Sequence, residues 1–250
     1  MVTRRNYPSN VEEMNMQRMA HRNLKFAAIA ALIGVSYIFI IRTISTILPG
    51  LFTHLSIAQA NTVAFLIASL VILLFFIVFY GHYVQKDQVK LAGATLLAIL
   101  GQCGTLVLRI KTLFRVFNIY LLTSFVYSYH FLDRFVPWVS SLFIFVFFYI
   151  FYRELEHSNK QQLKNATILA ALGSFVILLM QTFFMFHYFF TRGVIPIANI
   201  PPTIGIIFYI MVILNFCAML YFFISFYRSI DTELSSHQAE AVSPARATSP

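Results

Sequence analysis

Acidic residues are scarce in this chain, and none of them lies deep inside an apolar stretch. Only 9 of the 250 residues are Asp or Glu, and charged residues of both signs make up 11% of the sequence, where a soluble domain has about a quarter. Proton-coupled carriers and pumps generally pass protons through Asp, Glu or His side chains inside the membrane. This shortage argues against a proton-driven transporter and excludes an intramembrane protease that uses paired aspartates.

Cysteine and the common catalytic motifs give no sign of an enzyme either. The two cysteines, Cys103 and Cys217, both lie inside apolar stretches, so no disulfide framework is expected. The chain has no glycine-rich nucleotide loop, catalytic serine elbow or zinc motif. Its last apolar stretch contains no Lys that could form a retinal Schiff base. These absences favour a protein that is not an enzyme and that binds no cofactor.

Long apolar stretches make up most of what is present. Apolar residues account for 59% of the chain, and crossing a hydrocarbon core about 30 Å thick takes about 20 residues of helix, with about 17 as a minimum. Because these stretches are apolar all round, the sequence predicts an all-α, polytopic transmembrane helix bundle of seven spans over residues 26–228. The predicted spans are Phe26–Leu48, Ile57–Tyr80, Leu91–Leu108, Val116–Leu132, Val136–Tyr152, Ala166–Phe190 and Ile204–Tyr227.

The two polar ends of the chain differ in their expected structure. Residues 1–25 form a basic leader in which Asn10 is followed three positions later by Glu13. This pattern is typical of a helix N-cap and predicts a short interfacial helix that runs into the first span. Residues 229–250 end in a mixture of small residues and proline that cannot bury enough apolar surface to fold. We expect this tail to be disordered.

The basic residues do not orient a seven-span bundle, because Lys and Arg outside the spans divide almost evenly between the two faces. If residues 91–108 entered and left on one face, six spans would remain and nearly all of the basic residues would share a face. This stretch contains Gly101-Gln102-Cys103-Gly104, which could form the turn of such a re-entrant hairpin. Two half-helices need more than its 18 residues, so we expect seven spans and keep the re-entrant segment as the alternative.

Three amide side chains lie near the middle of their predicted spans: Gln102, Gln181 and Asn215. A polar side chain in lipid usually forms an interhelical hydrogen bond worth about 0.6–2 kcal/mol, so holding helices together is the simpler interpretation. The alternative is a shared pocket at the midplane, lined by aromatic residues such as Tyr209 and Phe183, in which a few polar groups orient a ligand. These five residues are candidate ligand-binding residues.

Arg42 is the sixth candidate, because it is the one strongly charged residue well inside a predicted span. A buried guanidinium costs several kcal/mol unless it is paired, but Arg42 lies about two turns before Pro49 and its long side chain can reach the interface. Contact with an anion or a lipid headgroup is the functional alternative. The net charge of +9 is spread over both ends and several connections, which indicates attraction to the bilayer and its anionic headgroups rather than to nucleic acid.

Three histidines, His82, His130 and His187, lie towards the carboxyl ends of even-numbered predicted helices, which places them on one membrane face. Three imidazoles on one face could ligate a metal, and two could hold a haem iron. Each histidine has aromatic neighbours that are typical of an interfacial belt, and none of the three belongs to a His-x-x-x-His or Glu-x-x-His spacing. We expect belt residues, with a metal site as the weaker alternative.

Small residues indicate where two helices approach each other closely. Ala94, Ala98, Gly101 and Thr105 fall on one helical face of the third predicted span. Small side chains allow close backbone contact in a membrane, where burial of apolar surface gives no driving force. We expect this face to pack against the small-residue face of the sixth predicted span, formed by Ala166, Ala170 and Gly173.

The number of helices, their length and the short basic connections are similar to those of serpentine receptors. The resemblance is limited to topology, because Asn215 is not followed by the Pro-x-x-Tyr of the common receptor family and Asp133-Arg134-Phe135 follows the fourth stretch rather than the third. We therefore expect an integral, multi-pass membrane protein that acts as a non-enzymatic receptor or sensor for a small apolar or amphiphilic ligand. The alternative is a uniport-like carrier, a channel or a structural or assembly subunit of a membrane complex.

Overall fold

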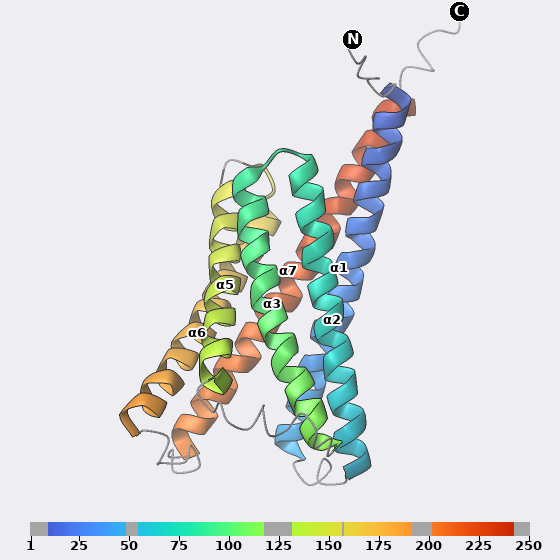
Figure 1. The fold of residues 1–250 in the computed structure, drawn as a ribbon. Helices are drawn as coiled ribbons and strands as arrows, with labels where there is room; N and C mark the ends of the chain where they lie inside the picture. Colours follow the sequence, from blue (N-terminus) through green and yellow to red (C-terminus); the bar gives the residue numbers. More distant parts are fainter. Residues whose placement is uncertain (1–9, 49–54, 118–131, 157, 192–201, 243–250) are drawn as a thin grey trace, which may run out of the picture.

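The computed structural model describes residues 10–48, 55–117, 132–156, 158–191 and 202–242. This part of the chain forms six long helices that run alternately in opposite directions (Figure 1). They are α1 (Asn10–Ile47), α2 (Leu55–Gln85), α3 (Val89–Val116), α5 (Leu132–Leu155), α6 (Gln161–Thr191) and α7 (Pro202–Val242).

Each of these six helices is long and apolar enough to cross a membrane. A helix satisfies its backbone hydrogen bonds internally, which lipid requires of any segment that it surrounds. Buried hydroxyl groups follow the same rule: Thr95 donates to the carbonyl of Leu91 at 2.7 Å, and Thr167 donates to the carbonyl of Leu163 at 2.8 Å. The chain is an all-helical, integral, multi-pass membrane protein.

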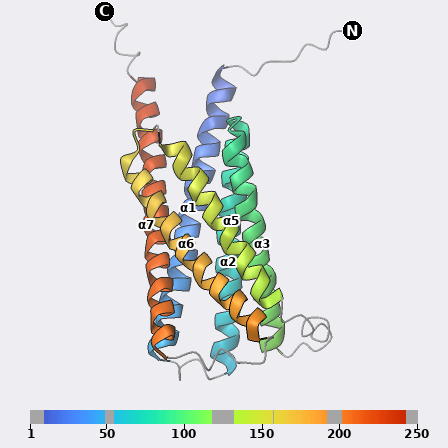
Figure 2. The ribbon, with the colours of Figure 1, turned by 90° about the vertical axis from the view of Figure 1, so that its left-hand side faces the viewer.

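The helices pack as a closed ring. In chain order each helix contacts the one before it and the one after it, and α7 closes the ring by packing against α1. Among the described residues the backbones of helices that face each other across the ring do not approach closely. Figure 2 shows α7 and α3 at opposite edges of this view, with α6 and α5 between them. This arrangement leaves space at the centre that side chains must fill or line.

Two ion pairs show which helix ends share a face of the bundle. Lys111 near the end of α3 lies 2.6 Å from Asp133 in the first turn of α5, and these residues mark what we call the mouth face. Lys25 in α1 pairs with Asp231 in α7 at the opposite end, which we call the termini face. Because each ion pair joins residues on one face, the chain between the two residues must cross the membrane an even number of times.

The prediction of seven spans is not confirmed. The predicted fourth span, Val116–Leu132, lies almost wholly outside the described residues, and the chain leaves α3 and enters α5 on the same face. One crossing between these helices would separate Lys111 from Asp133 by the thickness of the membrane. The six described spans therefore do not support the resemblance to serpentine receptors in its number of helices.

The re-entrant alternative is wrong, because α3 is one continuous helix from Val89 to Val116. Its glycines allow close packing instead of a turn. A Cβ atom at Gly101 would lie 3.0 Å from the carbonyl oxygen of Ser140, and one at Gly104 would lie 2.9 Å from the Oγ of the same serine. The small-residue face of α3 therefore packs against α5.

The expected contact between the small-residue faces of α3 and α6 is also wrong. Within the described residues these two helices do not touch, and the α6 face packs against α7 instead. A Cβ atom at Gly173 would lie 2.9 Å from the Oδ1 of Asn215 in α7. The small residues were correctly identified as contact sites, but the partners change because α5 follows α3 directly around the ring.

The turn between α2 and α3 explains how these helices form an antiparallel pair. Asp87 has a φ of 56°, which is the left-handed conformation. Many helices end with a residue in this conformation, and that residue is usually glycine. The N–H of Gln88 donates to the carbonyl of Tyr83 at 3.1 Å, and the N–H of Asp87 donates to that of Val84 at 3.2 Å. These two bonds satisfy carbonyls at the end of α2 and allow α3 to begin at Val89.

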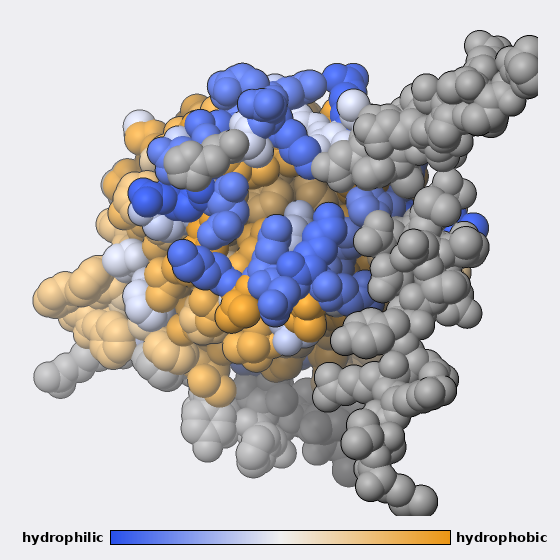
Figure 3. Space-filling view, turned by 90° about the horizontal axis from the view of Figure 1, so that it is seen from above, coloured by the Kyte–Doolittle hydropathy of each residue, from blue (hydrophilic) through white to orange (hydrophobic). Residues whose placement is uncertain are grey.

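The terminal helices extend beyond the others on the termini face (Figure 1). The described part of the amino end belongs to α1, which runs from Asn10 without a break into the first span. The tail that was expected to be disordered from residue 229 instead continues α7 to Val242. Hydrophilic side chains gather on the termini face, as Figure 3 shows.

The core on the termini side is aromatic. Nine phenylalanines from α2, α5 and α7 are 0–3% exposed and contact one another. These helices are not neighbours in the ring, so the rings of this aromatic cluster meet across its centre; Phe75 and Phe223 are 5.0 Å apart, and Phe148 and Phe222 are 4.9 Å apart. The cluster consists of Phe75, Phe76, Phe79, Phe147, Phe148, Phe151, Phe222, Phe223 and Phe226.

Candidate functional site

A cavity of about 450 Å³ occupies the centre of the ring, and all six described helices contribute to its lining. Its inner end is formed by Phe76, Phe148 and Phe223, which belong to the aromatic cluster. From there the cavity extends towards the mouth face, where Arg42 and Thr112 line it close to the ends of their helices. The aromatic cluster therefore closes the cavity on the termini side.

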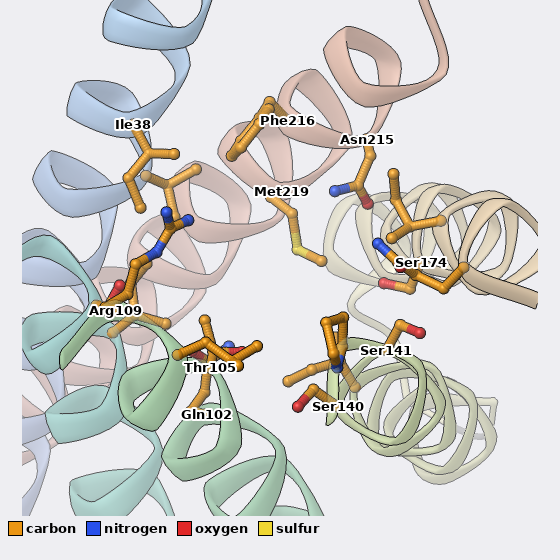
Figure 4. Close-up of a pocket in the computed structure, with 18 of the residues that line it drawn as sticks. Ile38, Gln102, Thr105, Arg109, Ser140, Ser141, Ser174, Asn215, Phe216 and Met219 are labelled. Carbon is orange, nitrogen blue, oxygen red and sulfur yellow. The ribbon is translucent and has the colours of Figure 1, made fainter. Parts of the chain in front are cut away.

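Gln102 of α3, Gln181 of α6 and Asn215 of α7 all line this cavity. Figure 4 shows Gln102 and Asn215 on opposite sides of the open space. The Oδ1 of Asn215 and the Oγ of Ser174 are buried and have no hydrogen-bond partner among the described residues. The amide oxygen of Asn215 therefore accepts no hydrogen bond from Gln102 or Gln181, and the role of the three amides in binding a ligand stays a proposal.

Six hydroxyl side chains that were not among the predicted site residues also line the cavity: Ser69, Thr105, Thr112, Ser140, Ser141 and Ser174. Figure 4 labels Thr105 and the serines of α5 and α6. Spacing could have identified two of them. Thr105 follows Gln102 by three residues, and Ser174 precedes Gln181 by seven, so each shares a helical face with a predicted amide. Ser140 and Ser141 in α5 follow Pro137, which also lines the cavity. This helix contains no amide side chain that could have indicated which of its faces lines the cavity.

The mouth of the cavity is cationic. Arg42 of α1 and Arg109 of α3 both line it, and both guanidinium groups lie over the ring of Phe65 in α2. The Cζ atoms are 6.0 Å and 5.0 Å from the centre of that ring. Arg42 is exposed and Arg109 is half-buried, as expected for residues at an opening.

Arg109 was not predicted, because the third span was expected to end at Leu108. The helix continues to Val116 and places Arg109 inside the span. Its position seven residues after Gln102 puts both side chains on one face of α3. The same spacing rule that fits Thr105 would have found it.

The two aromatic residues that were predicted to line the pocket lie elsewhere. Neither Phe183 nor Tyr209 is among the described residues that line the cavity. Phe183 is 42% exposed and packs against Phe184 and Phe208, with ring centres 5.8 Å and 5.5 Å away. Its ring therefore belongs to the outer surface of α6 and α7, and the aromatic lining comes from the aromatic cluster and Phe216.

The histidines do not share a face. His82 lies near the end of α2 at the termini face, where its ring is 5.1 Å from that of His21. His187 lies near the end of α6, which runs in the opposite direction (Figure 1), and His130 lies outside the described residues. In the described part of the chain no three His, Cys, Asp or Glu residues are grouped so that they could hold a metal ion.

Comparisons with protein-family models, with curated proteins and with solved structures find no match for this chain. We therefore infer a function from the cavity itself.

Proposed function

We propose that this membrane protein is a non-enzymatic receptor or sensor that binds a small amphiphilic ligand in the cavity at the centre of its helix ring. The observation that carries the proposal is one cavity lined by all six described helices. Its volume of about 450 Å³ falls within the range of about 300–1,000 Å³ found for small-molecule sites.

The polar groups of the lining fit a role in ligand binding better than a role that is limited to holding helices together. Side chains that only hold helices together are expected to be paired, whereas the Oδ1 of Asn215 and the Oγ of Ser174 have no partner among the described residues. A buried polar group without a hydrogen bond costs about 1–3 kcal/mol. A ligand that donates to Asn215 and Ser174 would recover part of this cost.

A ligand at the centre of a ring can act on every helix at once. A bound molecule that contacts all six helices favours the ring geometry that fits it best, and so shifts the population of bundle conformations. The terminal helices α1 and α7 line the cavity through Ile38 and Met219 and also extend beyond the bundle on the termini face (Figures 1 and 4). They would carry such a change out of the membrane.

A carrier is the second candidate, and the closed inner end of the cavity favours it. A binding site that is open towards one face and closed towards the other by the aromatic cluster is what one state of an alternating-access carrier requires. Counterflow of radiolabelled decylphosphocholine in proteoliposomes separates the two functions. Accumulation that depends on the protein supports a carrier, and binding without flux supports a receptor.

The binding proposal is tested by filling the cavity. Thr105 lines it, whereas Val107 on the same helix is 61% exposed on the outer surface. We expect Thr105→Phe to weaken saturable binding of radiolabelled decanol to the protein in phosphatidylcholine nanodiscs by at least about tenfold, or 1.4 kcal/mol. Val107→Phe should bind like the wild type. Equal binding by both variants, with both eluting as folded protein, would refute a ligand site in the cavity.

A further inference from the structure

The two arginines at the mouth form a cationic pair that is fixed by a shared aromatic ring. Because the Cζ atoms of Arg42 and Arg109 lie 6.0 Å and 5.0 Å from the centre of the Phe65 ring, they are at most 11 Å apart. Phe65 is itself positioned by an edge contact with Tyr37, at 6.1 Å between ring centres. The guanidinium groups thus come from two helices and are oriented by a third.

This pair gives the cavity a net positive charge. No Asp or Glu is present among the described residues that line the cavity. Asp133, the described acidic residue at the mouth face, already pairs with Lys111 at 2.6 Å. Two like charges repel each other, so an anion that lies between them is stabilised by both.

The depth of the two arginines indicates an amphiphile instead of a simple anion. Arg42 lies three residues before the end of its span at Ser45, and Arg109 lies seven residues before the end of its span at Val116. At 1.5 Å per residue these positions are about 5 and about 10 Å inside the helix ends. Beyond them the cavity becomes polar but uncharged, and it ends at apolar rings.

We propose, as an extension of the proposed function on which it rests, that the ligand is a small anionic amphiphile. Its carboxylate or phosphate is held between Arg42 and Arg109, since guanidinium groups bind both anions through paired hydrogen bonds. Its apolar part extends past Gln102 and Asn215 towards Phe148 at the inner end. The ligand therefore lies along the axis of the ring with its charge at the mouth face.

The test compares four probes that share a ten-carbon chain and differ in charge: decanoate, decyl phosphate, decanol and decyltrimethylammonium. Radiolabelled probes are bound to the full-length protein in phosphatidylcholine nanodiscs, and binding to empty nanodiscs is subtracted. We expect the two anions to bind at least about tenfold more tightly than decanol, because their charge meets both guanidinium groups. Saturable binding of the cation would contradict the proposal.

Variants assign the effect to the two arginines. Arg42→Gln and Arg109→Gln should each weaken decanoate binding by about 10- to 100-fold, because each removes one of the two charged partners of the carboxylate. Decanol binding should stay within twofold of the wild type, because decanol carries no charge. Arg42→Lys and Arg109→Lys, which keep the charge but lose the paired geometry, should fall between these values. The matched control is Arg115→Gln, since Arg115 is exposed on the same helix and does not line the cavity.

The outcomes distinguish the two proposals. Equal affinity for decanoate and decanol, with both reduced by Thr105→Phe, would overturn the anionic ligand and leave the binding function in place. Saturable binding of none of the four probes would overturn both. Displacement of bound decanoate by phosphatidylglycerol in the nanodiscs would support the cationic site and identify a bilayer lipid as the source of the anion. Unchanged decanoate binding in both Gln variants would refute the role of the arginines.

Discussion

Glycine decides how closely α3 approaches α5. At Gly101 a Cβ atom would lie 3.0 Å from a backbone carbonyl oxygen of α5, which cannot move aside without shifting the helix. At Gly93 on the same helix a Cβ atom would meet nothing within 4 Å. The two glycines therefore have opposite expected responses to the same substitution.

We predict that Gly101→Ala lowers stability by about 1–3 kcal/mol because it overpacks the contact between α3 and α5. Gly93→Ala should instead raise stability by about 0.5–1 kcal/mol, because alanine restricts the unfolded chain and favours helix. Thermal unfolding of both variants in one detergent measures the difference. A midpoint for Gly101→Ala at or above that of the wild type would contradict the close approach.

Depth within a span allowed part of the candidate site to be predicted at this scale. Gln102, Gln181, Asn215 and Arg42 were selected as polar residues inside apolar stretches, and all four line the cavity. Phe183 was selected as an aromatic residue at suitable depth, but depth does not tell which side of a helix faces lipid. That information comes from the neighbours of each helix, which a single sequence does not provide.

At the scale of the helices, hydropathy predicted where spans lie but not how many times the chain crosses. Apolar length satisfies the requirement for a span whether a segment crosses or returns to the face that it left. Val116–Leu132 was one of the shortest predicted spans, and its end residues belong to helices whose ends share a face. The packing partners of the small-residue faces were predicted wrongly for the same reason, because a different number of crossings changes which helices are neighbours.

Thiol cross-linking tests the even number of crossings. In a chain with Cys103 and Cys217 replaced by Ser, we expect a short bifunctional maleimide to join Lys111→Cys to Asp133→Cys, since the native ion pair shows that a bridge the length of two side chains connects these positions. Lys25→Cys with Asp231→Cys should do the same at the other end. The control combines Lys25→Cys with Lys111→Cys, which lie on opposite faces and should not be joined. Cross-linking of the control pair alone would restore an odd number of crossings.

At the scale of the whole molecule, the six-helix topology gives the charge distribution a direction. Basic residues described on the termini face outnumber those towards the mouth face, and the positive-inside rule therefore predicts a cytoplasmic termini face. The former group is Arg22, Lys25, Lys86, Lys90, Arg153, Lys160, Lys164 and Arg228, and the latter is Arg42, Arg109, Lys111, Arg115 and Arg134. The cavity mouth would then face away from the cytoplasm.

Single-cysteine labelling in intact cells tests this orientation. We predict that cysteines introduced at Gln88 and Asn159, in the connections on the termini face, react with a membrane-impermeant maleimide only after permeabilisation. A cysteine introduced at Phe117, which is 43% exposed at the end of α3, should react in intact cells. The reverse pattern would place the mouth of the cavity in the cytoplasm.

The central claim is that a small amphiphile occupies the space inside the helix ring. Photo-crosslinking with a decanol analogue that carries a diazirine at its chain end, followed by peptide mass spectrometry, locates the ligand directly. We predict modification of cavity residues such as Ile144 and Met219, and loss of this modification when excess decanol is added. Modification confined to lipid-facing residues such as Leu172 and Leu214, which are 56% and 61% exposed, would contradict it.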